Sequence, residues 1–216
     1  KAHHPIEYLA ACLSADPDRR IALMADAGLR GIAMLPPDVN ASAAEFVPEE
    51  QGLRFGLAAV KHVGDEAAAR WVAERAQSGP FKDLFDFCRR AGAHGLNRRA
   101  VESLVRCGAF DATGGVRPRL LSQLDAALAD AAERRRDHDA GQMGLFEDHA
   151  LQQGAGASVP VTPAEWSAEQ AVRDEQELLG APLSALARAA LTNAADSVAP
   201  PPDRAAAGPA ASDDLR

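Results

Sequence analysis

Two apolar helical runs, each followed by a glycine turn, limit what this chain can fold into more than any other feature. The first run spans Leu53 to Gly64 and leads into a helical stretch that ends at Arg75. The second run spans Leu96 to Cys107 and breaks at Gly108 to Asp111. Glycine commonly ends a helix and begins a turn. We therefore expect two pairs of helices, each pair joined by a tight turn.

The first turn has the chemistry of a phosphate site. We expect a helix through Ala58 and Val60 to end at residues 62–64, with Asp65 capping the helix that follows. Glycine permits backbone angles that expose consecutive amides, and the start of a helix adds unpaired amides and a positive dipole end. A phosphate can bind such a nest, and the neighbouring Lys61 adds a charge. The usual form has a glycine where this chain has His62, which we expect to avoid the left-handed region.

The second turn repeats this outline. Asn97 is a suitable N-cap for a helix from Arg98 to Cys107, and the turn at Gly108 is followed by a long helix from about Arg117 to Arg136. Together the two turns predict a tandem helix-hairpin-helix domain, which grips both strands of a duplex by the backbone without reading its sequence. The first hairpin taken alone also fits an ordinary helix-turn-helix in a bundle. The residues that we predict to contact DNA are Lys61, His62, Val63, Gly64, Arg98, Arg99, Gly108 and Ala109.

The charge of the chain is unevenly distributed. The net charge is −8, but residues 54–136 contain 15 Lys and Arg against 10 Asp and Glu, a balance of +5. The other residues hold the remaining 8 of 23 basic and 21 of 31 acidic residues. Location matters more than the total for attraction to phosphates. The hairpin region is therefore the basic part, although a solvated helical surface would give the same balance.

Composition excludes several classes of protein. No apolar run reaches the roughly 18 residues that span a membrane, and no signal peptide is evident, so we expect a cytoplasmic protein. The cysteines at 12, 88 and 107 are widely spaced, so we expect reduced thiols without a disulfide. We expect no metal site and no cofactor in this chain.

A second candidate binding element follows the basic helix. In Asp139 to Asp148, two large apolar residues stand in polar sequence without periodic neighbours. Exposed apolar anchors of this kind are typical of a peptide that binds a pocket on a partner. A loop that packs Leu145 and Phe146 onto its own domain fits the same spacing. The residues of the predicted motif are Gln142, Met143, Leu145 and Phe146.

The chain divides into six predicted parts. We expect a mainly α protein with a small β-element and a disordered C-terminal tail. The parts are a helical region at 1–30, the β-element at 31–56, the tandem helix-hairpin-helix domain at 57–137, the peptide motif and linker at 138–163, an acidic helix at 164–184, and an Ala/Pro-rich tail at 185–216.

Several stretches, in order, resemble the alpha (catalytic) subunit of bacterial DNA polymerase III. Residues 1–13 resemble the segment that closes its fingers domain, and residues 35–40 and 54–57 are similar to the strands and turn that come next. Residues 79–81 and 97–111 follow its tandem hairpin domain, and residues 142–146 look like its internal motif for the sliding clamp. The resemblance covers residues 1 to about 184. After Ser184, where the family continues into an oligonucleotide-binding barrel, this sequence becomes Ala/Pro-rich.

The resemblance implies a part of a DNA-directed DNA polymerase, a nucleotidyltransferase of DNA replication. Its implied partners are double-stranded DNA, the sliding clamp (beta subunit) and other subunits of the polymerase III holoenzyme, with no membrane. The family's catalytic carboxylates lie upstream of residue 1, and no acidic pair here replaces the two-metal site of nucleotide transfer. We expect this segment to be inactive alone, with Mg²⁺ acting in the parent polymerase.

Two other hypotheses also fit the sequence. The first is a stand-alone helix-hairpin-helix adaptor whose hairpins pack against protein; added salt weakens phosphate contacts steeply and an apolar interface little. The second is a base-excision repair enzyme built on the same hairpin. Asp111 is its one candidate catalytic residue, and the sequence offers no convincing base pocket.

Overall fold

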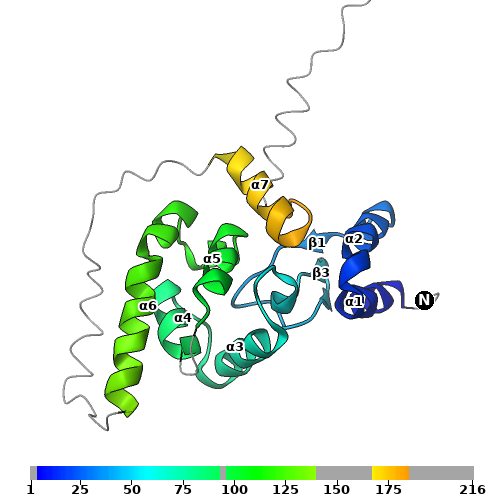
Figure 1. The fold of residues 1–216 in the computed structure, drawn as a ribbon. Helices are drawn as coiled ribbons and strands as arrows, with labels where there is room; N and C mark the ends of the chain where they lie inside the picture. The colour runs from blue at the N-terminus through cyan, green and yellow to red at the C-terminus, as the bar shows by residue number, and fades with distance from the viewer. Residues whose placement is uncertain (1–3, 93–95, 140–166, 185–216) are drawn as a thin grey trace, which may run out of the picture.

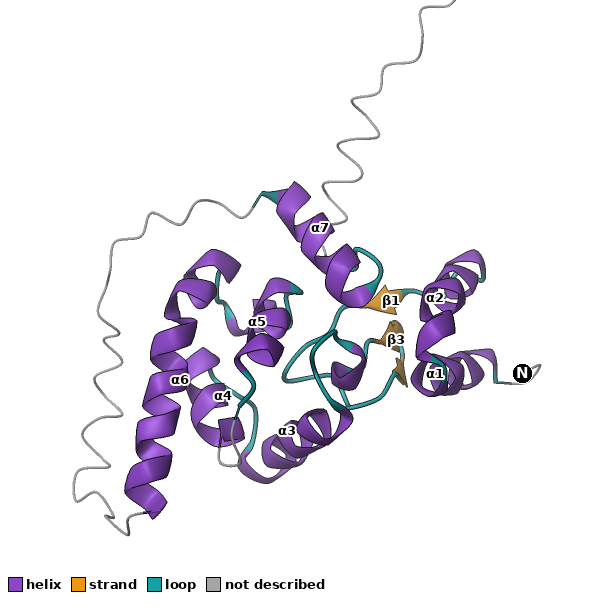
Figure 2. Ribbon diagram, viewed as in Figure 1, coloured by secondary structure: helices purple, strands orange, loops and turns teal. Residues whose placement is uncertain are grey.

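The computed structural model describes residues 4–92, 96–139 and 167–184, and these residues are mainly helical, as predicted (Figure 1). Three short strands lie among the helices (Figure 2). The helices are α1 (Pro5–Ala15), α2 (Arg20–Leu29), α3 (Asp65–Ser78), α4 (Leu84–Ala91), α5 (Arg98–Arg106), α6 (Arg117–Asp139) and α7 (Ala168–Leu179), with 3-10 turns η1 (Pro17–Arg19), η2 (Leu57–Ala59) and η4 (Asp111–Thr113).

The first two helices are separated by a capped turn at Asp16 and Pro17. The Asp16 carboxylate accepts a hydrogen bond from the Arg19 amide at 3.3 Å, and Pro17 opens the turn. Helix α2 continues past Gly28 to Leu29, and the left-handed residue that follows it is Gly31, with φ of 70°. The Ile32 amide bonds back to Ala27, which closes the helix end after Gly31.

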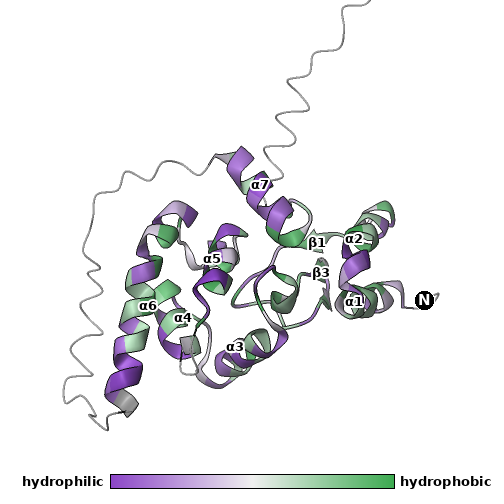
Figure 3. Cartoon of the chain, in the orientation of Figure 1, coloured by the Kyte–Doolittle hydropathy of each residue, from purple (hydrophilic) through white to green (hydrophobic). Residues whose placement is uncertain are grey.

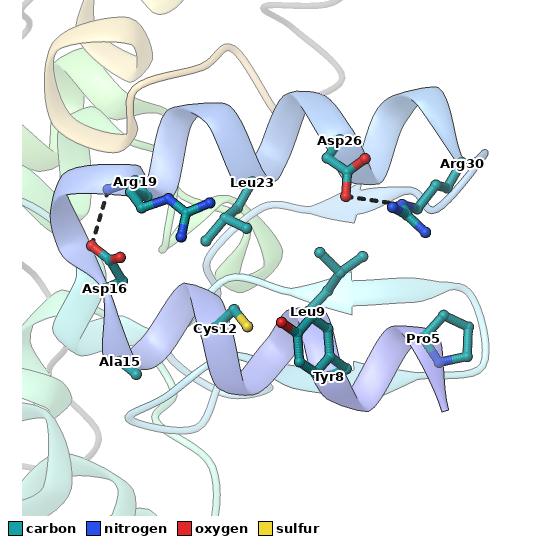
Figure 4. Close-up of a pocket in the computed structure, with 10 residues that line it drawn as sticks. All are labelled: Pro5, Tyr8, Leu9, Cys12, Ala15, Asp16, Arg19, Leu23, Asp26 and Arg30. Carbon is teal, nitrogen blue, oxygen red and sulfur yellow. Dashed lines mark hydrogen bonds and ion pairs between the residues drawn. The ribbon is translucent and has the colours of Figure 1, made fainter. Parts of the chain in front are cut away.

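A shallow groove of about 240 Å³ separates α1 from α2 (Figure 4). Tyr8, Leu9 and Cys12 line it from α1, and Leu23 lines it from α2. None of the predicted site residues lines this groove.

The predicted β-element is a three-stranded sheet in the order β1-β3-β2. β1 (Met34–Leu35) pairs in parallel with β3 (Gly52–Arg54), and β2 (Val47–Glu49) pairs antiparallel with β3. Val47 opposes Arg54 and Glu49 opposes Gly52, so the acidic turn at 49–52 joins the two antiparallel strands. The sheet lies between α1 and the hairpin region (Figure 1).

An aromatic cluster forms the centre of the hairpin region. The Phe87 ring is fully buried and makes edge-to-face contacts with Trp71, Phe81 and Phe110, at centroid distances of 5.2, 4.9 and 5.2 Å. These residues come from α3, α4 and the segments before α4 and after α5, so one ring ties four segments together. Phe110 therefore fills the core.

The long helix α6 packs along α4 and α5, and the C-terminal end of α6 is hydrophilic (Figure 3). Within the described residues no helix is both long and apolar enough to cross a bilayer. Cys12, Cys88 and Cys107 form no disulfide in the structure. Burial raises the pKa of Cys88 and of Cys107 to about 12, so both thiols stay protonated at neutral pH.

Candidate nucleic-acid interface

The segment before the first turn is not the helix that the sequence predicts. Residues 57–59 form the short 3-10 turn η2, and Val60 after it has extended backbone angles, with φ of −71° and ψ of 131°. The amides of Leu57 and Ala58 bond to the carbonyls of Ala43 and Ala44 at 3.0 Å each, which holds the turn against that segment. The partner segment lies far back in the sequence, so no local pattern reveals it.

His62 adopts the left-handed conformation that the sequence argument excluded, with φ of 70°. Two contacts with the rest of the fold hold it there. Its Nδ1 lies 3.1 Å from the Ser103 hydroxyl of α5, and its neighbours Val60 and Val63 are buried in the core. Packing against the rest of the fold therefore stabilises a left-handed conformation at His62, which a glycine would adopt without strain.

The start of α3 presents unpaired amides to solvent. Gly64 is the N-cap and is exposed, and no side chain caps the helix. The amides of Gly64, Asp65 and Glu66 form no hydrogen bond with any described residue. Asp65 and Glu66 lie in the first turn of α3, and their negative charges neutralise part of the positive end of the helix dipole. A second anion at this position therefore requires additional cations.

The fold itself does not require glycine at position 64. Its φ of −93° suits any residue, and no atom lies within 4 Å of the place where a Cβ would stand. A glycine that the fold does not need, next to free amides, fits close approach by another molecule's backbone.

The second turn is buried. The prediction that Gly108 and Ala109 offer free amides to DNA is therefore wrong. Both residues are buried, and their amides bond to Val105 and Leu104 at 3.1 and 2.9 Å. Here the fold does require glycine: φ is 84°, and a Cβ would lie 2.1 Å from the Arg117 guanidinium. The glycine in this hairpin makes room for an arginine.

Arg117 is the residue that covers this turn. Its guanidinium is 3% exposed and donates to Asp111 at 2.7 Å, to Glu175 of α7 at 3.0 Å and to the Arg106 carbonyl at 3.0 Å. Burial alone lowers the pKa of Arg117, but the hydrogen bonds and charges of Asp111 and Glu175 outweigh it, and the pKa lies above its ordinary value. The Asp111 carboxylate, the one candidate for repair chemistry, is thus engaged in the fold.

The acidic helix α7 lies against this basic region (Figure 1). The Arg106 guanidinium bonds to the buried Asp174 carboxylate and, at 3.2 Å, to Glu177. Glu177 also lies 3.4 Å from the Lys61 ammonium, and the Lys61 amide donates to the Leu178 carbonyl at 3.1 Å. No local sequence pattern signals this contact, because it joins residues more than 65 positions apart. The opposite charges of the two regions were the one available signal.

The remaining predicted DNA contacts differ in availability. Arg98 bonds to Glu102 at 2.8 Å and to Asp125 at 2.9 Å, so its charge is already paired. Arg99 is exposed and forms no ion pair within the described residues. Ser103 and Arg106 follow it at intervals of four and three along α5, which places them on the same side of the helix. The first turn and Arg99 are therefore the accessible part of the predicted interface.

The predicted peptide motif, Gln142, Met143, Leu145 and Phe146, lies outside the described residues, as does the tail at 185–216. The described helices α6 and α7 precede and follow the segment that contains the motif.

Comparison with known proteins relates the chain to one family of bacterial proteins. A family described as the helix-hairpin-helix motif matches residues 31–120. The chain is 46% identical over 151 residues to a DNA polymerase III subunit alpha of Thermus aquaticus, which is 68% of this chain and 12% of that protein. A subunit of the same name from Caulobacter vibrioides is 40% identical over 149 residues, 68% of this chain and 13% of that protein. One from Neisseria meningitidis serogroup B is 35% identical over 190 residues, 85% of this chain and 16% of that protein. The chain thus spans 12–16% of the length of these relatives.

Proposed function

The chain is homologous to a segment of bacterial DNA polymerase III alpha subunits, and from this premise we propose that it holds a replicative polymerase on DNA. The first hairpin binds the phosphate backbone of duplex DNA, and the peptide at residues 142–146 binds the sliding clamp. Nucleotide transfer, with its Mg²⁺ ions, belongs to other parts of the polymerase, and this segment is inactive alone.

Gly64 is the observation that carries the duplex-binding half of the proposal. It is exposed, it heads an uncapped helix, and neither its backbone angles nor its surroundings require glycine. A phosphate oxygen can approach the amides at 64–66 only where no side chain shields them. The contact involves the backbone of the duplex and is therefore independent of base sequence.

The clamp-binding half rests on the sequence of the motif and on its position between two helices. Helices α6 and α7, which flank residues 140–166 in the sequence, both pack against the hairpin region. A clamp that encircles the same duplex is then held at two points. Two linked attachments retain a complex far longer than either alone, through effective concentration.

Replacement of Leu145 and Phe146 by alanine in the 216-residue chain is expected to abolish clamp binding and leave duplex binding unchanged. The two side chains are the apolar anchors of the motif, and loss of such anchors removes most of the binding energy of a short peptide. The measurement is the affinity of each protein for the isolated clamp and for a bare duplex, together with its dissociation rate from a duplex that carries a clamp.

A matched control is Leu151→Ala, which removes a similar side chain from the same segment outside the motif. The control should dissociate from clamp-loaded duplex as slowly as the unmodified chain. Equal clamp affinity for the double variant and the control would contradict the clamp-binding proposal.

A further inference from the structure

We propose that the phosphate site at the first hairpin extends to Arg106 of α5, and that Glu177 of α7 occupies this site as a competitor for the phosphodiester. This inference rests on the proposed binding of duplex DNA by the first hairpin. It adds one cation to that site and gives α7 a role in setting its affinity.

The Glu177 carboxylate marks an anion site that two separate elements create. One oxygen lies 3.4 Å from the Lys61 ammonium beside the first turn, and the other lies 3.2 Å from the Arg106 guanidinium. A phosphodiester also presents two anionic oxygens and forms charge-assisted bonds with the same pair of groups. The hydrogen bond from Lys61, the charge of Arg106 and that of Lys61 hold the pKa of Glu177 below its ordinary value, so the competitor is ionised at neutral pH.

The contact can open without release of α7. The side chains of Lys61 and Glu177 are 51% and 49% exposed, and ion pairs as exposed as this one contribute little to folding in water. The helix is anchored elsewhere: Leu178 and Leu179 are buried in the core, Asp174 bonds to Arg106, and Glu175 bonds to Arg117. Glu177 can therefore swing away while its helix stays in place.

The charges around the first turn make a competitor effective. Asp65 and Glu66 already place two carboxylates at the start of α3, so phosphate binding there depends on cations from outside the helix. Lys61 and Arg106 are the cations that the Glu177 bridge joins, and Glu177 neutralises part of both charges. Removal of its charge should leave Lys61 unpaired and Arg106 paired with Asp174 alone, so that both can contact a phosphate.

The test is duplex affinity of the Glu177→Gln variant at two salt concentrations, with Glu169→Gln as the control. Glu169 lies on the same helix, in its first turn, and has no ion-pair partner among the described residues, so both variants change net charge equally. At low salt we expect Glu177→Gln to bind about two- to fivefold more tightly than the unmodified chain, with a smaller gain at higher salt, as for a weak exposed ion pair. The control should stay close to the unmodified chain.

Two further variants test the assigned cations in the Glu177→Gln background. Lys61→Gln should remove the gain in affinity. Arg106→Gln combined with Asp174→Asn should do the same, because the second change avoids a buried carboxylate without a partner. Retention of the gain after the Arg106 change would overturn the extension of the site to α5.

The outcomes separate this inference from the proposed function. If the unmodified chain binds duplex and Glu177→Gln matches Glu169→Gln, the competitor role is wrong and duplex binding stands. If neither the unmodified chain nor any variant binds duplex, the proposed function fails, and the inference fails with it.

Discussion

Replacement of Phe87 by alanine is expected to lower the free energy of unfolding by about 3–5 kcal/mol, the range for loss of a large ring from a packed core. The Phe87 ring contacts Trp71, Phe81 and Phe110 at 5.2 Å or less, and it is completely buried. The loss would be a large fraction of the roughly 5–15 kcal/mol that stabilises a typical domain. Urea unfolding followed by tryptophan fluorescence measures it, because Trp71 is part of the cluster.

Phe85→Ala is the matched control for this variant. Phe85 lies on the same helix, α4, and is only partly buried. Its replacement should cost about 1–2 kcal/mol, in proportion to the smaller apolar area that it buries. Equal losses for the two variants would show that the aromatic cluster is not the centre of the hairpin region.

Replacement of Arg117 by alanine is expected to cost a similar amount, about 3–5 kcal/mol, because it leaves a buried carboxylate without its counter-charge. Glu175 is fully buried and is bonded to Arg117 at 3.0 Å and to the amides of Leu183 and Ser184 at 2.7 and 2.9 Å. The same change removes the cover of the second turn and loosens α7. Chemical unfolding gives the loss, and hydrogen exchange of the α7 amides shows whether that helix is released.

Arg119→Ala serves as the control, since Arg119 is exposed and its side chain forms no ion pair within the described residues. It should change stability by no more than about 0.5 kcal/mol, as is usual for surface positions. In the Arg117→Ala background, Glu175→Gln should recover part of the lost stability, because it removes the uncompensated charge. Strict additivity of the two changes would argue against a direct interaction between them.

Local sequence patterns encode some features of this fold. Helix α5 begins where the sequence predicts, because its Asn97 cap and apolar stripe are local features, and the Asn97 side chain accepts from the Arg99 amide at 3.0 Å. The exposed start of α3 was also predictable, since it follows from Gly64 and the helical run after it.

The features that the sequence did not reveal depend on distant partners. His62 is left-handed while bonded to Ser103, which lies 41 residues away. Gly108 resembles a phosphate-binding glycine in sequence, but Arg117 occupies the space beside it. Glu177 meets Lys61 across 116 residues, and no local pattern signals that contact. One hairpin is therefore accessible where the sequence predicted two.

The most direct test of the central claim is duplex affinity of the Gly64→Asp variant, measured together with its thermal unfolding. Aspartate is at least as good an N-cap as glycine, so it should leave stability unchanged or raise it by a few tenths of a kcal/mol. Its carboxylate would bond to the amides of α3 and repel phosphate, so duplex binding should be lost. Gly64→Asn, which caps without a charge, should weaken binding less. An aspartate variant that folds as well as the unmodified chain and binds duplex equally tightly would contradict the claim that this turn binds the DNA backbone.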